Sequence, residues 1–593
     1  MDKKFGHKQK DSFSQNVNTI YFVMILIAIG LISQMIRWQL IHGQELKIQA
    51  QEQYTQQTSQ KHGRGTITTE NGTILAIDEP RWNVYASLSS DARERKIFFN
   101  QKEKYVAEVS GILEIPKKEI EKKLDKNFRF VLLKRGVTTD KKELLASANI
   151  FGKDAPPGLG LYFQKEEERI YPNNTLAAHI IGFIGKDWRG ETVGRYGIEG
   201  FYNEDLTGVK SYSYEEKDSK GNIILTAEYT PITADNTKNV ILTIRPNIQK
   251  KVEDQLKAGV IKHQAKSGSA IVMEVKTGKI LAMANYPTYN PNEYWKTPET
   301  WIYKNKAIAD VYEYGSVAKP ITEAIALETN SVAPDWICHD RTGKIKVYDK
   351  TIYTWDKNPD GDLDLAGVLI NSNNPCAVRL ALATPFKLYY EKLKEFGIGQ
   401  FIGLGLQDEA TSYLPPYEEW TKVDLAVSAF GQGISATPLQ IMNAINTIAN
   451  KGKRVRPYIV SEIQGKNKTI KIKPQVLSTP ISEKTAKIVI KNMQAMVNEG
   501  ESRKYFHKEL PQYSIAGKTG TAQIPKKNAA GYEENKTNVT FIGFAPAEDP
   551  QIIMIVRLEQ PKTSTYSAST AVPTWISIFK AIADDLEIPK NNS

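Results

Sequence analysis

The sequence predicts an α+β protein of several domains, with a single N-terminal transmembrane helix, an elongated mixed α/β segment and an α/β sandwich built on an antiparallel sheet. Three observations predict it. An uncharged apolar run lies near the N-terminus, short strands and turns begin near residue 63, and strands enclose a largely helical middle from residue 239 onward. Strands from both ends of a long segment can pair in one sheet whose faces are covered by helices.

The apolar run predicts a membrane anchor. Residues 17–36 are 20 uncharged positions, enough for a helix to cross the roughly 30 Å hydrocarbon core of a bilayer. Lysines before the run favour a cytoplasmic tail, and no small-x-small cleavage site follows it. We therefore expect a cytoplasmic tail at 1–16, an uncleaved anchor at 17–38 and the remainder outside the cytoplasm; a buried soluble helix is the weaker alternative.

The composition of the chain excludes few further classes of protein. The chain of 593 residues is 41% hydrophobic and 24% charged, which is enough to bury a core. Its net charge of +11 suits an anionic partner such as nucleic acid, membrane or cell wall, or is simply a solvated basic surface.

Seven histidines without an HExxH or CxxC pattern give a zinc site little support. Cys338 and Cys376 are expected to be unpaired structural thiols, although an exported chain could join them in one bridge.

The segment after the anchor has four predicted features. Residues 39–60 are rich in glutamine and are expected to form a linker helix. Asn71-Gly72 separates two alternating runs, which predicts a hairpin. Two short amphipathic helices are expected over 106–126, divided by Pro116, and a turn is expected at residues 220–222.

The last segment begins with a strand over 239–244 and a helix over 248–260 that is expected to end at Gly259. Two strands over 268–285 flank a turn at Thr277-Gly278. A hairpin is expected over 538–559, broken between Pro546 and Pro550, and an amphipathic helix over 573–586.

The stretch SIAGKTGTAQI, residues 514–524, contains Gly517-Lys518-Thr519, which looks like the end of a phosphate-binding loop. Such a loop needs a glycine five positions before Gly517, and Gln512 stands there. An alternating apolar pattern follows, where the loop would require a helix. We therefore predict a strand and reject a nucleotide site.

A candidate nucleophile lies in YEYGSVAKPITEAIALE, where Ser316 and Lys319 are three residues apart in a run with helical spacing. A serine hydroxyl needs a nearby base, and a lysine can act as one if burial or another cation lowers its pKa. This pair alone is a weak signal. Two further clusters strengthen it: Ser372, Asn373 and Asn374 at a loop that enters a helix, where Asn373 or Asn374 could also cap, and Lys518, Thr519 and Thr521 on the predicted strand, where Gly520 leaves room for another backbone.

In this order the motifs SxxK, SxN and KTG resemble the penicillin-binding protein and serine β-lactamase superfamily. Further stretches, GRGTI, RIYPNNTLAAHIIGFIG, YGIEGFYNEDLTG and GQGISATPLQ, are similar to class B penicillin-binding proteins, most of all their division-specific septal group. Tyr314 stands where that family commonly has proline. The resemblance implies a pedestal (dimerisation) domain over 61–238 and a transpeptidase domain over 239–593, with a serine β-lactamase/transpeptidase-like sandwich.

The resemblance also implies the roles of the site residues in acyl transfer on D-alanyl-D-alanine stem peptides. Ser316 would be the nucleophile, Lys319 its base, Ser372 a proton relay, Asn374 an orienting group and Lys518 a source of positive potential. Thr519, Gly520 and Thr521 would meet the substrate, with Thr519 and Thr521 at its carboxylate. The backbone N–H groups of Ser316 and Thr521 would form the oxyanion hole. No metal or other cofactor is implied.

The implied partners are peptidoglycan stem peptides, β-lactams as covalent inhibitors, and a membrane glycan polymerase with other division proteins; nucleic acid is not among them. Four alternatives stay open. A β-lactamase would need a water-activating group, and no matching ExxLN segment lies between the second and third motifs. A β-lactam sensor, a non-catalytic scaffold of the division machinery and an elongation-type transpeptidase are the others.

Overall fold

The computed structural model describes residues 8–36, 55–60, 63–88, 92–124, 130–148, 150, 159–208, 211–216, 237–526 and 531–591. The chain divides into two units, of which one contains residues 1–62 and 209–235 and the other residues 63–208 and 236–593. The turn expected at 220–222 and most of the expected linker helix lie outside the described residues.

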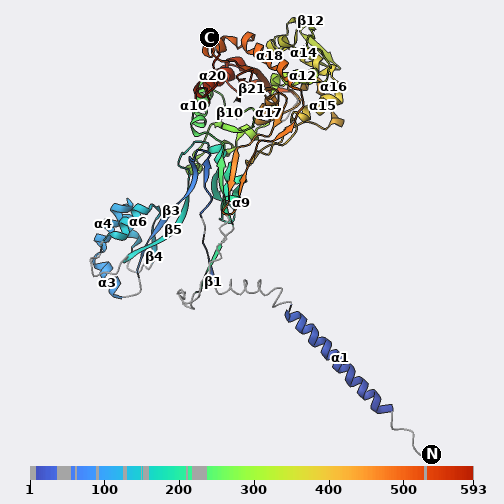
Figure 1. The fold of residues 1–593 in the computed structure, drawn as a ribbon. Helices are drawn as coiled ribbons and strands as arrows, with labels where there is room; N and C mark the ends of the chain where they lie inside the picture. Colours follow the sequence, from blue (N-terminus) through green and yellow to red (C-terminus); the bar gives the residue numbers. More distant parts are fainter. Residues whose placement is uncertain are drawn as a thin grey trace, which may run out of the picture. The chain divides into compact units, whose positions relative to one another are not determined.

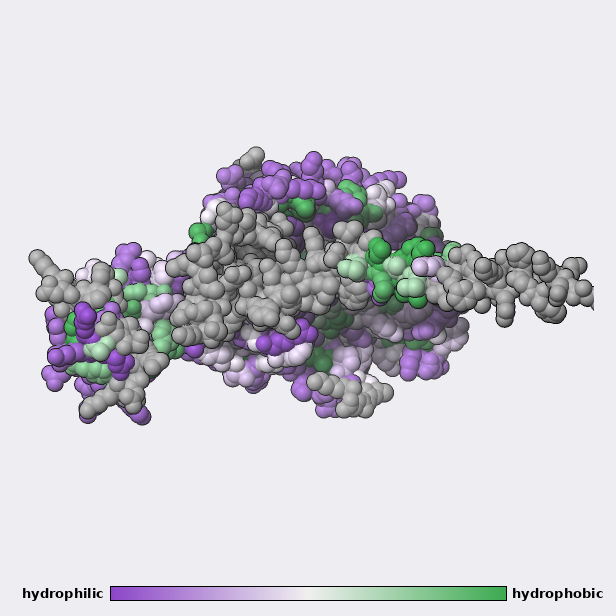
Figure 2. Space-filling view, turned by 90° about the horizontal axis from the view of Figure 1, so that it is seen from below, coloured by the Kyte–Doolittle hydropathy of each residue, from purple (hydrophilic) through white to green (hydrophobic). Residues whose placement is uncertain are grey.

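The first unit contains the helix α1, Lys8–Ile36, drawn in dark blue in Figure 1. Its apolar side chains from Tyr21 to Met35 are exposed. Figure 2 colours hydrophobic residues green and hydrophilic residues purple. Within the described residues, no helix meets the length and hydropathy needed to cross a membrane.

A two-stranded sheet completes the first unit. Strand β1, Thr55–Gln60, pairs antiparallel with β8, Ser211–Glu216, so that Thr55 lies opposite Glu216. The prediction of helix up to residue 60 is therefore wrong for these six residues. Their hydrogen-bonding partner lies about 150 residues further along the chain, and local sequence does not reveal such a partner.

The second unit begins with a mixed sheet in the order β18-β17-β9-β2-β3-β4, with β5 also paired to β3. Gly72, at φ +82°, forms the turn between β2 and β3, which confirms the predicted hairpin. The helices predicted around Pro116 are confirmed as α4 and α5. The strands are β2 Ile67–Thr69, β3 Ile74–Ser87, β4 Phe130–Val137, β5 Gly160–Ile170, β9 Asn239–Leu242, β17 Val460–Gln464 and β18 Thr469–Lys471; the helices beside them are α3 Ala92–Asn100, α4 Lys102–Leu113, α5 Lys117–Lys123 and α6 Thr139–Ser147.

Two hydrophobic cores occupy this unit. The smaller core lies where α3 to α6 cover β3, β4 and β5, and it includes Val84, Tyr105 and Leu133. The larger core extends from the neighbouring strands through the whole of the C-terminal segment. Between the two segments lie the short elements α7 Ala178–Ile181, β6 Phe183–Lys186, β7 Thr192–Arg195, α8 Gly197–Phe201 and α9 Asn203–Thr207.

A five-stranded antiparallel sheet forms the centre of the C-terminal segment, in the order β11-β10-β22-β21-β20. Its edge strands come from residues 280–286 and 516–525, as predicted for a sheet closed by distant parts of the chain. Figure 1 shows the sheet between α10 with α20 and a second group of helices that includes α12, α14, α17 and α18. The strands are β10 Ser267–Glu274, β11 Ile280–Tyr286, β20 Ala516–Pro525, β21 Tyr532–Ala545 and β22 Ile552–Glu559.

The helices of this segment, with the short strands among them, complete the sandwich. Helix α10, Pro246–Lys262, continues past Gly259, so the predicted end is wrong. A Cβ on Gly259 would lie 2.4 Å from the side chain of Thr574 on α20, and the glycine therefore allows two helices to approach closely. The other elements are α11 Lys306–Ala309, η4 Gly315–Ala318, α12 Lys319–Glu328, β12 Cys338–Asp340, β13 Lys344–Val347, β14 Lys350–Tyr353, β15 Gly361–Leu363, α13 Leu365–Ile370, α14 Asn374–Ala383, α15 Phe386–Glu395, α16 Lys422–Ser428, α17 Pro438–Ala449, β16 Arg454–Val455, β19 Val476–Ser478, α18 Glu483–Glu499, α19 Arg503–Glu509 and α20 Ala571–Ile582, with the 3-10 turns η2 Pro291–Lys296, η3 Thr300–Tyr303, η5 Tyr417–Glu419 and η6 Ser567–Ser569.

Cys338 and Cys376 form a disulfide, which corrects the expectation of unpaired thiols. The bond joins β12 to α14, and both cysteines are buried. They are 38 residues apart in sequence, yet their Cα atoms lie 5.8 Å apart because α14 packs against β12. Spacing along the chain does not contain this information.

Candidate active site

A short 3-10 turn presents the predicted nucleophile. Ser316 lies in η4, and Lys319 begins α12 directly after it. The Nζ atom of Lys319 lies 3.0 Å from Oγ of Ser316, and the lysine is only 1% exposed. Residues 317 to 327 are all buried, so this turn is fixed by the core while Ser316 stays partly exposed.

The second motif approaches the same lysine. Oγ of Ser372 lies 3.0 Å from Nζ of Lys319, and Oδ1 of Asn374 accepts a hydrogen bond from it at 2.8 Å. Ser372 has a φ of +52°, a left-handed conformation that costs a non-glycine residue roughly 1–3 kcal/mol and that clusters at functional sites. Asn373, and not Asn374, caps α14, because its Oδ1 accepts from the backbone N–H of Cys376.

The third motif lies on β20, the strand predicted for it. Nζ of Lys518 donates to Oγ of Ser372 at 3.1 Å, and it also lies 3.2 Å from Oγ1 of Thr519. A Cβ on Gly520 would be 2.4 Å from Cγ2 of Val317 and 2.7 Å from the carbonyl oxygen of Tyr314. Gly520 therefore lets the strand lie directly against the nucleophile turn.

Thr521 lies beside this turn but its side chain has another partner. Oγ1 of Thr521 accepts a hydrogen bond from the backbone N–H of Ser567 at 3.2 Å. A Cβ on Gly315 would be 2.8 Å from the carbonyl oxygen of Thr521, which places the backbones around Ser316 and Thr521 close together. The oxyanion hole and the substrate contacts of Thr519, Gly520 and Thr521 remain predictions.

Both lysines have lowered pKa values. Burial holds the pKa of Lys319 well below its ordinary value, the neighbouring Lys518 lowers it further, and Asp360 partly opposes this. Burial lowers the pKa of Lys518 to about 7, with Glu501 opposing. The site therefore favours a neutral amine beside Ser316, which is the form of lysine that can take a proton.

The groups that support the second motif could not be selected from the sequence. Nδ2 of Asn373 donates to Oδ2 of Asp340 at 2.8 Å and to Oδ2 of Asp360 at 2.7 Å. Nδ2 of Asn374 donates to the carbonyl oxygen of Tyr353 at 3.0 Å. Asp340 is fully buried, but aspartates are so often found in loops that no sequence signal distinguishes it.

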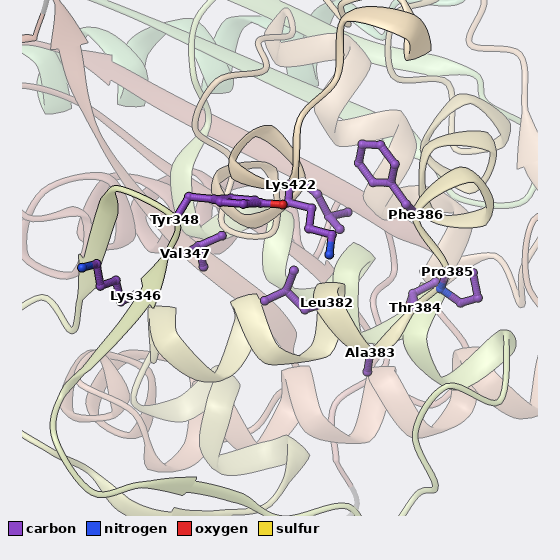
Figure 3. Close-up of a pocket in the computed structure, with 10 residues that line it drawn as sticks. Lys346, Val347, Tyr348, Leu382, Ala383, Thr384, Pro385, Phe386 and Lys422 are labelled. Atoms are coloured by element: carbon purple, nitrogen blue, oxygen red, sulfur yellow. The ribbon is translucent and has the colours of Figure 1, made fainter.

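A surface cavity of about 700 Å³ lies at the other end of α14 and contains none of the predicted site residues. Figure 3 shows it among Tyr348, Leu382, Phe386 and Lys422. In the described part of the chain, no three His, Cys, Asp or Glu side chains gather in a group that could hold a metal ion.

The fold and the three converging motifs define a serine acyl-transfer enzyme of the penicillin-binding type. The family description "Penicillin binding protein transpeptidase domain" matches residues 268–584, and "Penicillin-binding Protein dimerisation domain" matches residues 59–242. The chain belongs to the penicillin-binding protein family, which confirms the resemblance found in the sequence.

Several named proteins are similar to this chain over most of its length. It is 28% identical to Stage V sporulation protein D of Bacillus subtilis, over 93% of this chain and 83% of that protein. It is 27% identical to Peptidoglycan D,D-transpeptidase FtsI of Escherichia coli K12, over 95% of this chain and 91% of that protein. The crystal structure of Penicillin Binding Protein 2X from Streptococcus thermophilus matches it with a TM-score of 0.78 and 25% identity, over 91% of this chain and 83% of that one.

Proposed function

We propose that this protein is a peptidoglycan D,D-transpeptidase that cross-links stem peptides through an acyl-enzyme on Ser316. One observation carries the proposal: buried Lys319 lies within hydrogen-bonding distance of Ser316, Ser372 and Asn374 at once. Relatives whose names include this activity support it. The pedestal matched by the dimerisation-domain description is expected of such an enzyme and gives a β-lactamase no advantage.

In the proposed first step, Oγ of Ser316 attacks the carbonyl carbon of the penultimate D-alanine while its proton passes to the neutral amine of Lys319. The tetrahedral intermediate then collapses, and the peptide bond to the terminal D-alanine breaks. The leaving amine takes a proton through Ser372, whose Oγ lies close to both Lys319 and Lys518. The product is an ester on Ser316.

In the second step, an amine from a neighbouring stem attacks this ester. Its surplus proton returns through the same lysine and serine, and Oγ of Ser316 leaves with a proton. Backbone N–H groups of Ser316 and Thr521 would stabilise the oxyanion in both steps; removing one such donor typically lowers kcat by about 100- to 1,000-fold. Thr519 and Thr521 would face the terminal carboxylate, with Gly520 keeping the strand close.

The same proposal includes the membrane location and the cellular role of the enzyme. We infer a single membrane anchor at residues 17–38, supported by the uncharged run and by the exposed apolar side chains of α1, with the catalytic domain on the extracytoplasmic side. Similarity to the FtsI relatives supports septal cell-wall synthesis as the role, and a membrane glycan polymerase is the partner that we expect for it. β-Lactams are expected to acylate Ser316.

Labelling with a fluorescent penicillin tests the nucleophile. Ser316→Ala should abolish covalent labelling, because the variant lacks the oxygen that forms the ester, while the purified protein still melts cooperatively. Ser331→Ala is a matched control, since that serine follows α12 and should leave labelling unchanged. Persistent labelling of Ser316→Ala would refute the assignment.

Hydrolysis of nitrocefin by the same preparation separates this function from a β-lactamase. A transpeptidase is expected to consume about one equivalent and then turn over slowly, because its acyl-enzyme resists water. Rapid steady-state hydrolysis would favour the lactamase instead.

A further inference from the structure

An acidic side chain lies three residues before the nucleophile and has no part in the mechanism above. Oε1 of Glu313 accepts a hydrogen bond from the backbone N–H of Gly433 at 3.1 Å. Its Oε2 accepts from the hydroxyl of Tyr532 at 3.1 Å. The carboxylate therefore connects the nucleophile segment to the loop at 431–433 and to the start of β21.

These two neighbouring segments adjoin elements that carry predicted site residues. Gly431 is so close to Gly315 that a Cβ there would lie 2.3 Å from the carbonyl oxygen of Gly315. Tyr532 pairs with Pro525, at the end of the strand that carries Lys518. Glu313 and Ser316 are both partly exposed, whereas Tyr314, Gly315 and Val317 are buried. The same short segment thus carries the proposed nucleophile and a partly exposed acid three residues before it.

The charge of Glu313 is not neutralised within the described residues. Its hydrogen-bond donors, a backbone N–H and a phenol, are both uncharged, and no Lys or Arg pairs with it there. Partial burial without a cation raises its pKa above the ordinary value. A carboxylate held this way is costly for the fold alone, because an amide could accept from Gly433 through its oxygen and donate to the Tyr532 oxygen through its NH2, without a charge to desolvate.

We propose that Glu313 binds the ammonium group of the acceptor stem peptide and so selects a cationic amine, in preference to water, as the second substrate. This inference rests on the proposed transpeptidase reaction and concerns only its second step. The chemistry fits, because the acceptor arrives as a primary ammonium ion that a carboxylate attracts, whereas neutral Lys319 offers it no charge and Lys518, where protonated, would repel it. The bound ammonium then loses one proton to the Lys319–Ser372 pair and attacks the ester. The pair passes that proton to the departing Oγ of Ser316, and the second proton lost by the attacking nitrogen is released to water.

Competition between two acceptors tests the proposal on the full-length protein. The donor is an N-acyl-D-alanyl thioester, and the acceptors are glycinamide, which carries an ammonium group, and methanol, which is uncharged. Glu313→Gln should lower the ratio of amide to methyl ester about 10- to 100-fold, as expected when one charged hydrogen bond is lost. The rate of acylation by fluorescent penicillin should stay unchanged, because Glu313 acts after acylation.

Two control variants separate binding of the ammonium from a structural role. Glu409→Gln removes another half-buried carboxylate, which accepts from the backbone N–H groups of residues 402–404, and it should leave the product ratio unchanged. Tyr532→Phe removes a hydrogen bond from Glu313 but keeps the negative charge, so the ratio should change by less than about threefold.

The outcomes distinguish the two proposals. If the wild-type protein neither reacts with penicillin nor consumes the thioester, the proposed function fails. If the wild type forms the amide and Glu313→Gln forms it equally well, only the role of Glu313 is overturned. If Glu313→Gln also slows acylation as much as it lowers the product ratio and lowers the melting temperature, Glu313 has a structural role and the proposal is overturned. The same conclusion follows if Tyr532→Phe lowers the ratio of amide to methyl ester as much as Glu313→Gln does.

Discussion

Two buried lysines share one serine, and Lys518 makes the charged form of Lys319 less favourable. Both Lys319 and Lys518 are 1% exposed and both contact Oγ of Ser372. Two ammonium groups at this spacing repel each other, and burial removes the water that would solvate them. In the proposed mechanism, the proton of Ser316 therefore passes to a lysine whose lowered pKa favours the neutral amine, which an isolated, solvated lysine would not provide.

Lys518→Met tests this coupling through the pH dependence of acylation. The pKa of Lys319 is lowered, so the neutral base forms as pH rises through that value and the acylation rate rises with it. Removing the charge of Lys518 raises the pKa of Lys319, and we expect the acid limb of the profile to move to higher pH. The second-order rate of labelling by fluorescent penicillin, measured from pH 5 to 9, reports the shift.

The stability of the same variant provides the control. With its pKa near 7 in the folded protein and 10.5 as its ordinary value, Lys518 binds fewer protons when folded, so its burial is less costly as pH rises from 7 to 10.5. The Met variant should lack this gain in melting temperature. An unshifted acid limb in a variant that does lack it would show that Lys518 does not influence Lys319.

At the scale of elements, the site depends on how closely strand β20 approaches the 3-10 turn η4. Gly520 faces Val317 and Tyr314 at distances that leave no space for a Cβ. Sequence reasoning recognised that Gly520 allows a close backbone approach, but it did not identify which backbone. The backbone that Gly520 approaches, at Tyr314 to Val317, lies about 200 residues earlier in the chain. Only the packing of the sheet against η4 and α12 brings the two segments together.

Gly520→Ala should move β20 away from the nucleophile turn. Because a displacement of about 1 Å can lower a rate about 100-fold, acylation by fluorescent penicillin should slow by roughly that factor. Gly111→Ala is the control, since no atom lies within 4 Å of the added Cβ on α4 and acylation should stay unchanged. If Gly520→Ala is acylated at the wild-type rate, this account of the site is contradicted.

At the scale of the whole second unit, three of the recognised pedestal stretches meet in one buried ionic network. Glu199 from YGIEGFYNEDLTG accepts from Arg64 of GRGTI at 2.5 Å and from Arg169 of RIYPNNTLAAHIIGFIG at 2.7 Å. Asp78 also pairs with Arg169, at 3.0 Å. These three stretches are far from Ser316 in sequence. Their shared ion pairs indicate that they stabilise the fold.

Glu199→Gln should destabilise the protein by about 3–5 kcal/mol, because it leaves two buried guanidinium groups without full compensation. Acylation of the protein that remains folded at low temperature should be unchanged, since the network does not reach Lys319 or Lys518, the proposed catalytic lysines. Glu168→Gln is the matched control: its carboxylate pairs with Arg81 at the surface, where it is 52% exposed, and its loss should hardly change the melting temperature. A similar destabilisation by both variants would contradict the special role of Glu199.

The family, the three motifs, the central antiparallel sheet and the hairpins could be predicted from the amino-acid sequence, because they depend on periodicity, turn residues and motif order along the chain. Tertiary structure alone decided the Cys338–Cys376 bond, the strand at residues 55–60, the capping role of Asn373 and the position of Glu313 beside Gly433 and Tyr532. Each of these is a contact between groups distant in sequence or a choice between neighbouring side chains. Local propensity does not specify such contacts, since packing of the two cores sets which distant atoms meet.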